Sequence, residues 1–298
     1  MLQTGIKLAG VSLRNPVMAA SGTAGYGEEM SQHFDLNALG ALVIKSTTRA
    51  PRTGNPWPTT AQTSAGWLNA VGLKNPGIDV VIREKLPWLA TNYPNLPIVG
   101  SVAGADIAEY VDVAKQLASA VNVAFIEVNI SCPNVANEGM AFGTDPQTVR
   151  ELTQRVVQAV AKPVFVKLTP NVTDIVAIAQ AAAAGGAAGL VMINTLMGME
   201  IDLATQKPHL AYGTGGLSGQ AIHPLAMRMI HQVHEVLDLP IVGVGGVMNG
   251  KDAVEMMLAG ASAVQVGAAT FGDPLACVKI AEEIPTVLAQ YQLTWPKN

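Results

Sequence analysis

The sequence predicts a single (β/α)8 barrel, an α/β fold in which eight parallel strands alternate with helices. Short apolar runs rich in β-forming residues recur along the chain, and segments with helical spacing lie between them. The runs are apolar on both faces, which is typical of parallel strands covered by helices. The chain has 298 residues, and such a barrel typically needs about 250. We therefore expect one domain over residues 1–298.

Eight segments have the composition of barrel strands. In chain order they are residues 17–20, 41–45, 97–103, 124–130, 163–168, 189–194, 240–246 and 263–269. A doubly wound open sheet is the competing architecture. Its GxGxxG fingerprint is missing after the first strand, where SGTAGYGEE has its glycines in another order and spacing. The pattern therefore favours the barrel.

The segments between the strands predict helices and two additions. Apolar residues at helical spacing mark residues 106–121, 145–161, 173–186, 223–237 and 251–261. Asp145 followed by Pro146 is typical of a helix start. Residues 2–15 suggest a hairpin that caps the bottom of the barrel, and residues 46–82 form a long polar insertion after the second strand. A long loop inside a compact domain is usually functional, so we expect a role for this insertion.

Composition and charge exclude several classes of partner. Charged residues make up only 13% of the chain, against about 25% in average domains, which predicts much buried surface. The net charge is −4 and no basic block occurs, so nucleic acid and anionic membranes are poor candidates. The uncharged stretch 175–199 is long enough for a membrane span, but its pattern changes at Gly185-Gly186 from a helix to a buried strand. With no long apolar core in MLQTGIKLAGVSL, we expect a cytoplasmic protein.

The two cysteines have different surroundings. They are too few for a disulfide framework or a four-thiolate cluster, and reducing cytosol is a simpler interpretation than one bridge between them. Cys277 lies in an apolar helical segment and is expected to be a small buried side chain. Cys132 lies in a polar loop, NISCPN, where a thiolate serves as nucleophile or as general base. No cysteine–histidine pair with obvious spacing occurs, and His231 and His234 are expected on a helix surface.

Polar residues collect where the predicted strands end. Active sites of barrels lie at the carboxyl ends of the strands. Lys45 and Lys167 end two otherwise apolar strands, and a buried ammonium group is costly without an anion. Salt bridges to loop carboxylates are the plain alternative, but together with strand-end amides the lysines favour a ligand site. The strand ends carry Ser21, Lys45-Ser46, Ser101, Asn129, Lys167, Asn194-Thr195, Gly245-Gly246 and Gly267.

The last two strands add a second signal. GVGGVMNGKDA and VGAATFGDP both run from a strand through glycine into a helix start. Backbone amides at such places bind anions, and barrels often hold a phosphate there. Tight turns alone would explain one such loop, but two together favour a phosphorylated ligand such as flavin mononucleotide (FMN). No metal site is expected.

These residues resemble the class 1 dihydroorotate dehydrogenases along nearly the whole chain. The matching segments are ASG (20–22), KSTT (45–48), NAVGLKNPG (69–77), NISCPN (129–134), FGTDP (142–146), VKLTPNVTD (166–174), INTLMG (193–198), GGLSG (215–219) and GVGGV (243–247). Together they are highly specific, although only NISCPN is strong by itself.

The resemblance implies an activity and roles for residues. This family oxidises (S)-dihydroorotate to orotate in pyrimidine synthesis, with FMN as cofactor. Cys132 matches the base that removes a proton from substrate C5, while a hydride passes from C6 to flavin N5; class 2 relatives, which associate with membranes, use serine there. Lys167 would stabilise negative charge on the reduced flavin. Substrate contacts would come from Lys45, Asn69, Val71, Gly72, Leu73, Asn129, Asn134, Asn194 and Thr195. FMN contacts would come from Ser21, Lys45, Ser46, Ser101, Asn129, Lys167, Ile193, Gly219, Gly245, Gly246, Gly267 and Ala268.

The sequences of the last two strands and of INTLMGME resemble those of class 1B, whose members pass electrons to NAD⁺. They do so through a partner subunit that carries FAD and a [2Fe–2S] cluster, and two cysteines are too few to hold that cluster in this chain. We therefore expect a homodimer that assembles with such a subunit into a heterotetramer. The alternatives are a class 1A homodimer that uses fumarate, and a flavin-binding barrel without catalysis, against which Cys132 and Lys45 argue. Two residues depart from the pattern: many relatives have Asn in place of Ser101, and many class 1B members have a glycine pair in place of Glu138-Gly139.

Overall fold

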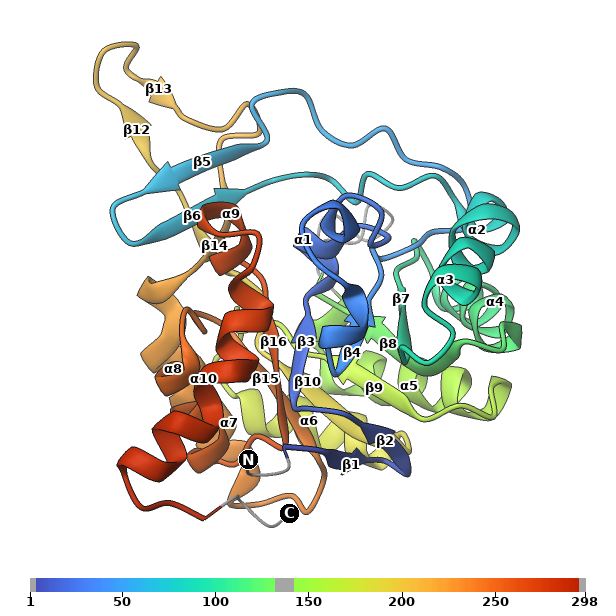
Figure 1. Ribbon diagram of the computed structural model, residues 1–298. Coiled ribbons are helices and arrows are strands. Elements are labelled where there is room, and N and C mark those ends of the chain that lie inside the picture. Colours follow the sequence, from blue (N-terminus) through green and yellow to red (C-terminus); the bar gives the residue numbers. More distant parts are fainter. Residues whose placement is uncertain (1–3, 132–141, 295–298) are drawn as a thin grey trace.

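The computed structural model describes residues 4–131 and 142–294. Eight parallel strands close into a barrel, so the predicted fold class is confirmed (Figure 1). Seven of the eight predicted segments contain one strand each, and the strand in the eighth, 124–130, begins one residue earlier, at Val123. The strands are β3 (Val17–Ala19), β4 (Ala41–Val43), β7 (Ile98–Val102), β8 (Val123–Asn129), β9 (Val164–Lys167), β10 (Gly189–Met192), β15 (Ile241–Val244) and β16 (Ala263–Val266). β16 pairs with β3, which closes the ring.

Helices surround the barrel, as the alternation predicts. The longer ones are α3 (Leu86–Asn92), α4 (Ile107–Ser119), α5 (Pro146–Ala159), α6 (Ile175–Ala184), α7 (His223–His234), α8 (Gly250–Leu258) and α10 (Ala276–Gln290). Short turns of helix are α1 (Ser21–Ala24), η1 (Met30–Gln32), η2 (Leu36–Ala38), α2 (Ile78–Val80), η3 (Val81–Lys85), η4 (Phe142–Thr144), η5 (Gln220–Ile222) and α9 (Ala269–Gly272). Asp145 caps α5 through Thr148 N, and Pro146 is its first residue, both as predicted.

Side chains alternate between the outside and the inside of the barrel, because successive residues of a strand point to opposite faces. On β8, Ile126 and Val128 belong to the core between strands and helices, whereas Phe125 packs inside the barrel. The rings of Phe125 and Phe165 meet edge to face, with centroids 5.4 Å apart. These rings fill the lower part of the barrel, and the next inward positions, Glu127 and Lys167, therefore lie one layer higher.

Two additions close the ends of the barrel. The predicted hairpin forms from β1 (Ile6–Leu8) and β2 (Val11–Leu13), and its Leu8 and Leu13 pack against the apolar layer inside the barrel. At the opposite end, a four-stranded antiparallel sheet covers the mouth (Figure 1). Its strands are β5 (Thr60–Thr63), β6 (Gly66–Asn69), β11 (Leu196–Gly198) and β14 (Gly215–Ser218). The insertion after the second strand thus pairs with the segment after the sixth, which the sequence did not predict.

A small ribbon of β12 (Ile201–Asp202) and β13 (Lys207–Pro208) extends from this sheet away from the barrel (Figure 1). Within the described part of the chain, no helix has the length and apolar character needed to cross a membrane. The uncharged stretch 175–199 forms instead the helix α6 and the buried strand β10, as predicted from its change of pattern.

Candidate functional site

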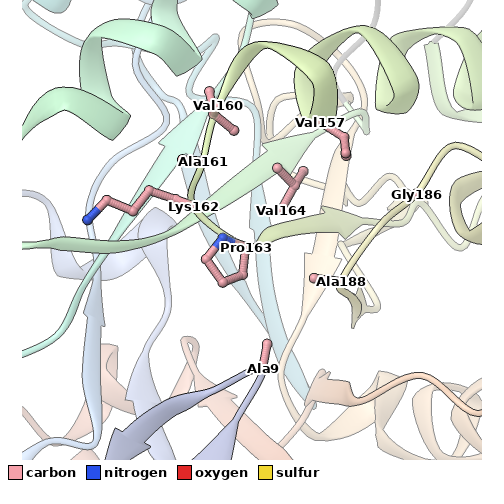
Figure 2. A pocket seen from close by; sticks show the side chains of 9 residues that line it. All are labelled: Ala9, Val157, Val160, Ala161, Lys162, Pro163, Val164, Gly186 and Ala188. Carbon is pink, nitrogen blue, oxygen red and sulfur yellow. The ribbon is translucent and has the colours of Figure 1, made fainter.

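A cavity of about 410 Å³ lies between the carboxyl ends of the barrel strands and the four-stranded sheet. A second, more open depression lies at the other end of the barrel (Figure 2). Lys162 is the one charged residue among the nine that line it, and the others are apolar or glycine. Because a binding site needs convergent polar groups, the cavity at the carboxyl ends is the candidate site.

The cavity brings together most of the residues singled out in the sequence. Those that line it are Ser21, Lys45, Ser46, Asn69, Val71, Gly72, Leu73, Asn129, Lys167, Ile193, Asn194, Thr195, Gly219, Gly245, Gly246, Gly267 and Ala268. Cys132 and Asn134 lie outside the described residues, as does the pair Glu138-Gly139. Ser131, directly before Cys132, lines the cavity.

Ser101 differs from the expectation that it contacts the cofactor. It is fully buried and does not line the cavity. Its hydroxyl lies 2.8 Å from Ser46 Oγ and donates to Glu127 Oε1 at 3.2 Å. Ser101 points into the barrel, as Val99 does two positions earlier, and lies beneath the residues that line the cavity. It supports Ser46 from beneath, and a direct ligand contact is not part of this geometry.

A polar layer forms the floor of the cavity. Lys167 Nζ donates to Gln265 Oε1 at 3.2 Å, and Gln265 Nε2 donates to Glu127 Oε2 at 2.7 Å. Lys167 and Gln265 line the cavity, whereas Glu127 is wholly buried beneath it. The buried lysine therefore has a partner inside the barrel, as the cost of burying a charge requires.

Amide side chains form the wall on the side of β8 and β10. Asn129 Nδ2 donates to Ser46 Oγ at 3.1 Å, and Asn129 Oδ1 accepts from Asn194 Nδ2 at 3.3 Å. Asn194 Oδ1 in turn accepts from Thr195 N at 2.8 Å. These bonds fix which end of each amide is nitrogen and which is oxygen, so the wall offers oriented hydrogen-bonding groups.

The insertion 46–82 supplies another wall of the cavity. Asn75 is buried and holds it in place, donating to Thr48 Oγ1 and Leu73 O, each at 2.8 Å. Asn69 Nδ2 donates to Gly216 O at 3.1 Å and thereby joins β6 to β14. The segment 71–73 lines the cavity between these two anchors, which agrees with the functional role expected for the insertion.

The ends of β15 and β16 line a part of the cavity where side chains are few and small. Gly245, Gly246, Gly267 and Ala268 line it. Gly246 has a φ of +73°, and a Cβ there would lie 2.7 Å from the Cβ of His223. Only glycine fits this turn, and the backbone is left open to a ligand. His223 is buried behind the turn, with Nδ1 3.2 Å from Gly245 O and Nε2 3.3 Å from Glu255 Oε2.

The charges that line the cavity are all positive in the described part of the chain: Lys45, Arg52 and Lys167. A site of this kind suits ligands with anionic groups. Cys277 is buried in α10, as predicted, and burial raises its pKa to about 12, which excludes it as a base near neutral pH. His231 and His234 are exposed on α7, also as predicted.

Several residues of the site were missed in the sequence. Glu127 and Gln265 sit inside apolar strands, and their signal was the alternation of the strand: Phe125, Glu127 and Asn129 share one face. Arg52 and Asn171 line the cavity from loops. They lie in the insertion 46–82 and in the matching segment 166–174, but neither residue was singled out. Asn171 holds the segment after β10 by donating to Thr195 O at 3.1 Å and accepting from Met197 N at 2.8 Å.

Comparison with known proteins identifies the family. The family model described as dihydroorotate dehydrogenase matches residues 1–288. The chain belongs to the dihydroorotate dehydrogenase family. It is 66% identical over 289 residues to the dihydroorotate dehydrogenase A (fumarate) of Lactiplantibacillus plantarum, covering 97% of this chain and 95% of that protein. A protein of the same name from Limosilactobacillus reuteri is 58% identical, with 96% and 93% covered.

Relatives named for NAD⁺ are also similar. The dihydroorotate dehydrogenase B (NAD(+)) catalytic subunit of Cutibacterium acnes is 54% identical, with 94% of this chain and 91% of that protein covered. The family and the enzyme class expected from the sequence are thus confirmed. The expected class 1B subclass is not confirmed, because the fumarate-named relatives above are more similar to the chain.

Proposed function

We propose that this enzyme oxidises dihydroorotate to orotate at the cavity described above, with FMN as its cofactor. The single observation that carries the proposal is the cavity itself, which has three cations, oriented amides and an open glycine turn among its described lining residues. Orotate has a carboxylate and several amide-like edges, and FMN has a phosphate. Cations suit the two anionic groups, and amide side chains suit the substrate edges.

The residues present fit FMN. The turn at Gly245-Gly246 and the segment Gly267-Ala268 would hold the phosphate, because they offer backbone without obstructing side chains. Ser21, Ile193 and Gly219 would line its path, and Lys45, Ser46, Asn129 and Lys167 would hold the ring. When bound, FMN supplies the acceptor for a hydride from substrate C6. Lys167 would place its positive charge where the ring gains electrons.

The chain's own residues would carry the remaining steps. Asn69, Asn129, Asn194 and Thr195 would orient the substrate, and the segment 71–73 would exclude water from one side. Asn134 would add a further amide. Cys132 would remove the C5 proton as general base, which balances the hydride lost from C6 and leaves the C5–C6 double bond of orotate. The proton would then leave to solvent when the thiol is deprotonated again.

Fumarate is the electron acceptor that we propose, since the relatives at 66% and 58% identity carry fumarate in their names. Electron transfer to NAD⁺ through a partner subunit with FAD and a [2Fe–2S] cluster is the second candidate, favoured by the relative at 54% identity. The two candidates differ in whether this chain alone completes the catalytic cycle.

The test uses the purified protein without other subunits. Anaerobic mixing with dihydroorotate should bleach the flavin absorbance near 450 nm, and addition of fumarate should restore it. Bleaching with no recovery by fumarate would favour the NAD⁺ route, and no bleaching would contradict the proposed activity. Cys132→Ala should slow flavin reduction by a factor of about 10² or more, the usual contribution of a positioned base. Cys277→Ala, which removes a buried thiol that does not line the cavity, is the matched control.

We also propose that the enzyme forms a homodimer through the arm made of β11, β12 and β13. Four apolar side chains on this arm are exposed: Met197, Met199, Ile201 and Leu203, the last by 87%. Exposed apolar groups gathered on one protrusion are typical of interaction sites. Leu203→Asp combined with Met199→Asp should reduce the mass found by light scattering to that of one chain. Val121→Asp changes an isolated exposed valine and should leave the mass unaltered.

A further inference from the structure

Glu127 and Lys167 stand apart from every other charged residue that the structure describes. In residues 4–131 and 142–294 they are the only Asp, Glu, Lys or Arg residues that are buried as a whole, with 0% and 6% of their surface exposed. Both point into the barrel, because each lies two positions above an inward phenylalanine, Phe125 or Phe165. A charge in such a place is strongly destabilising unless it is paired, so a carboxylate retained here calls for an explanation.

Both carboxylate oxygens of Glu127 accept a hydrogen bond. Oε1 accepts from Ser101 Oγ at 3.2 Å, and Oε2 accepts from Gln265 Nε2 at 2.7 Å. Gln265 Oε1 accepts in turn from Lys167 Nζ at 3.2 Å, and Lys167 Nζ lies 4.0 Å from Glu127 Oε1. The amide of Gln265 thus has its oxygen toward the cation and its nitrogen toward the anion.

The arrangement of these residues orients the two charges relative to the cavity. Lys167 and Gln265 line the cavity, whereas Glu127 and Ser101 lie beneath it. The positive end of the pair therefore faces a ligand, and the negative end lies beneath it. In a buried site with few mobile dipoles, both charges act on the ligand over distances of about 10 Å.

We propose that Glu127 is a positioning residue that fixes Lys167 in the cavity floor and moderates the positive field that Lys167 exerts on the bound flavin. The proposal rests on the FMN site described above. Lys167 favours the electron-rich reduced ring, and the carboxylate of Glu127 opposes this effect. Glu127 thereby lowers the reduction potential of the flavin from the value that Lys167 alone would give. The potential stays above the value expected for a cavity floor without charge.

The test is Glu127→Gln in the FMN-loaded protein, with the two-electron midpoint potential measured by reductive titration against a reference dye. A glutamine amide has the size of the carboxylate, its oxygen accepts from Gln265, and its nitrogen donates to Ser101, whose hydroxyl also accepts. Loss of one unit charge at roughly 10 Å in a medium of effective dielectric constant about 20 changes the equilibrium on the order of tenfold. The midpoint potential should become more positive by about 30 mV, which corresponds to a tenfold change in the equilibrium constant of a two-electron couple.

Ser101→Ala is the matched control, because it removes a hydrogen bond to Glu127 and keeps the charge. Its potential should stay near the wild-type value. An unchanged or more negative potential in Glu127→Gln, or an equal shift in both variants, would overturn the proposal.

A second measurement covers the case in which Glu127→Gln folds but is too unstable to load FMN. The apo forms of Glu127→Gln, Lys167→Met and the double variant are compared by urea unfolding. Since each single variant leaves one buried charge unpaired, the double variant should be more stable than Glu127→Gln. A double variant no more stable than Glu127→Gln would overturn the pairing. This cycle needs no cofactor, so its outcome is independent of whether the wild-type chain binds FMN.

Discussion

Gly216 lies directly against Thr195: a Cβ placed on Gly216 would be 1.9 Å from Thr195 Oγ1. Gly216 pairs with Asn69 on one side and Met197 on the other, so it has no room to move within the sheet. The close approach of these strands sets the position of Thr195 at the cavity wall, and it requires a residue without a side chain.

Gly216→Ala should therefore impair substrate binding. The methyl group would displace Thr195, and we expect the KM for dihydroorotate to rise about tenfold, the effect of losing a well-placed hydrogen bond. FMN content should stay at the wild-type level. Gly272→Ala adds a methyl group where nothing lies within 4 Å and is the control. A wild-type KM in Gly216→Ala would show that Thr195 makes no substrate contact.

His223 should determine how tightly FMN is held. Its Nδ1 bonds Gly245 O behind the turn, and its Nε2 faces Glu255. The side-chain nitrogen of asparagine can take the place of Nδ1, whereas that of glutamine can take the place only of Nε2. His223→Gln should weaken FMN binding fivefold to about tenfold, whereas His223→Asn should stay within about threefold, as measured by fluorescence titration of the apoprotein. Equal losses in both variants would contradict a specific role for the bond to Gly245.

Cys277 should be unreactive in the folded protein. Burial raises its pKa to about 12, so only about 10⁻⁴ of it is thiolate at pH 8. In the Cys132→Ala variant, a thiol reagent at pH 8 should label nothing until urea unfolds the chain, and then label one thiol per chain. Fast labelling of the native variant would show that α10 opens readily.

Asp145 should stabilise the fold only while it is ionised. Its side chain accepts from Thr148 N at 2.8 Å, and hydrogen bonds from Thr148 hold its pKa below the usual 3.8. A pKa lowered on folding gives stability above the unfolded value, and this stability is lost as the pH falls through the folded value. Asp145→Ala should cost about 1 kcal/mol of unfolding free energy at pH 7, and the difference from wild type should shrink below about pH 4.

Asp145→Asn is the control for this prediction. Asparagine also caps helices, so its loss at pH 7 should be smaller, and its stability should lack the pH-dependent contribution of the carboxylate. A deficit of Asp145→Ala that stays constant from pH 7 to pH 3 would show that the charge of Asp145 is irrelevant to its role.

The sequence by itself determined the barrel. Apolar runs on a parallel sheet must be covered on both faces, and their alternation with helices leaves few other ways to bury them. The same rule placed Lys45, Asn129 and Lys167 at one end, because carboxyl ends of parallel strands converge. The barrel and the placement of these strand-end residues depend on local periodicity and on chain direction, both of which are visible in the amino-acid sequence.

Only the tertiary structure decided which groups meet across the barrel. Glu127 and Gln265 are 138 residues apart, and their contact depends on the relative height of β8 and β16 in the closed ring. The pairing of β6 with β14, and the place of Ser101 beneath the floor, likewise follow from register between distant strands. Register is set by packing of the whole barrel, so no local stretch of sequence contains it.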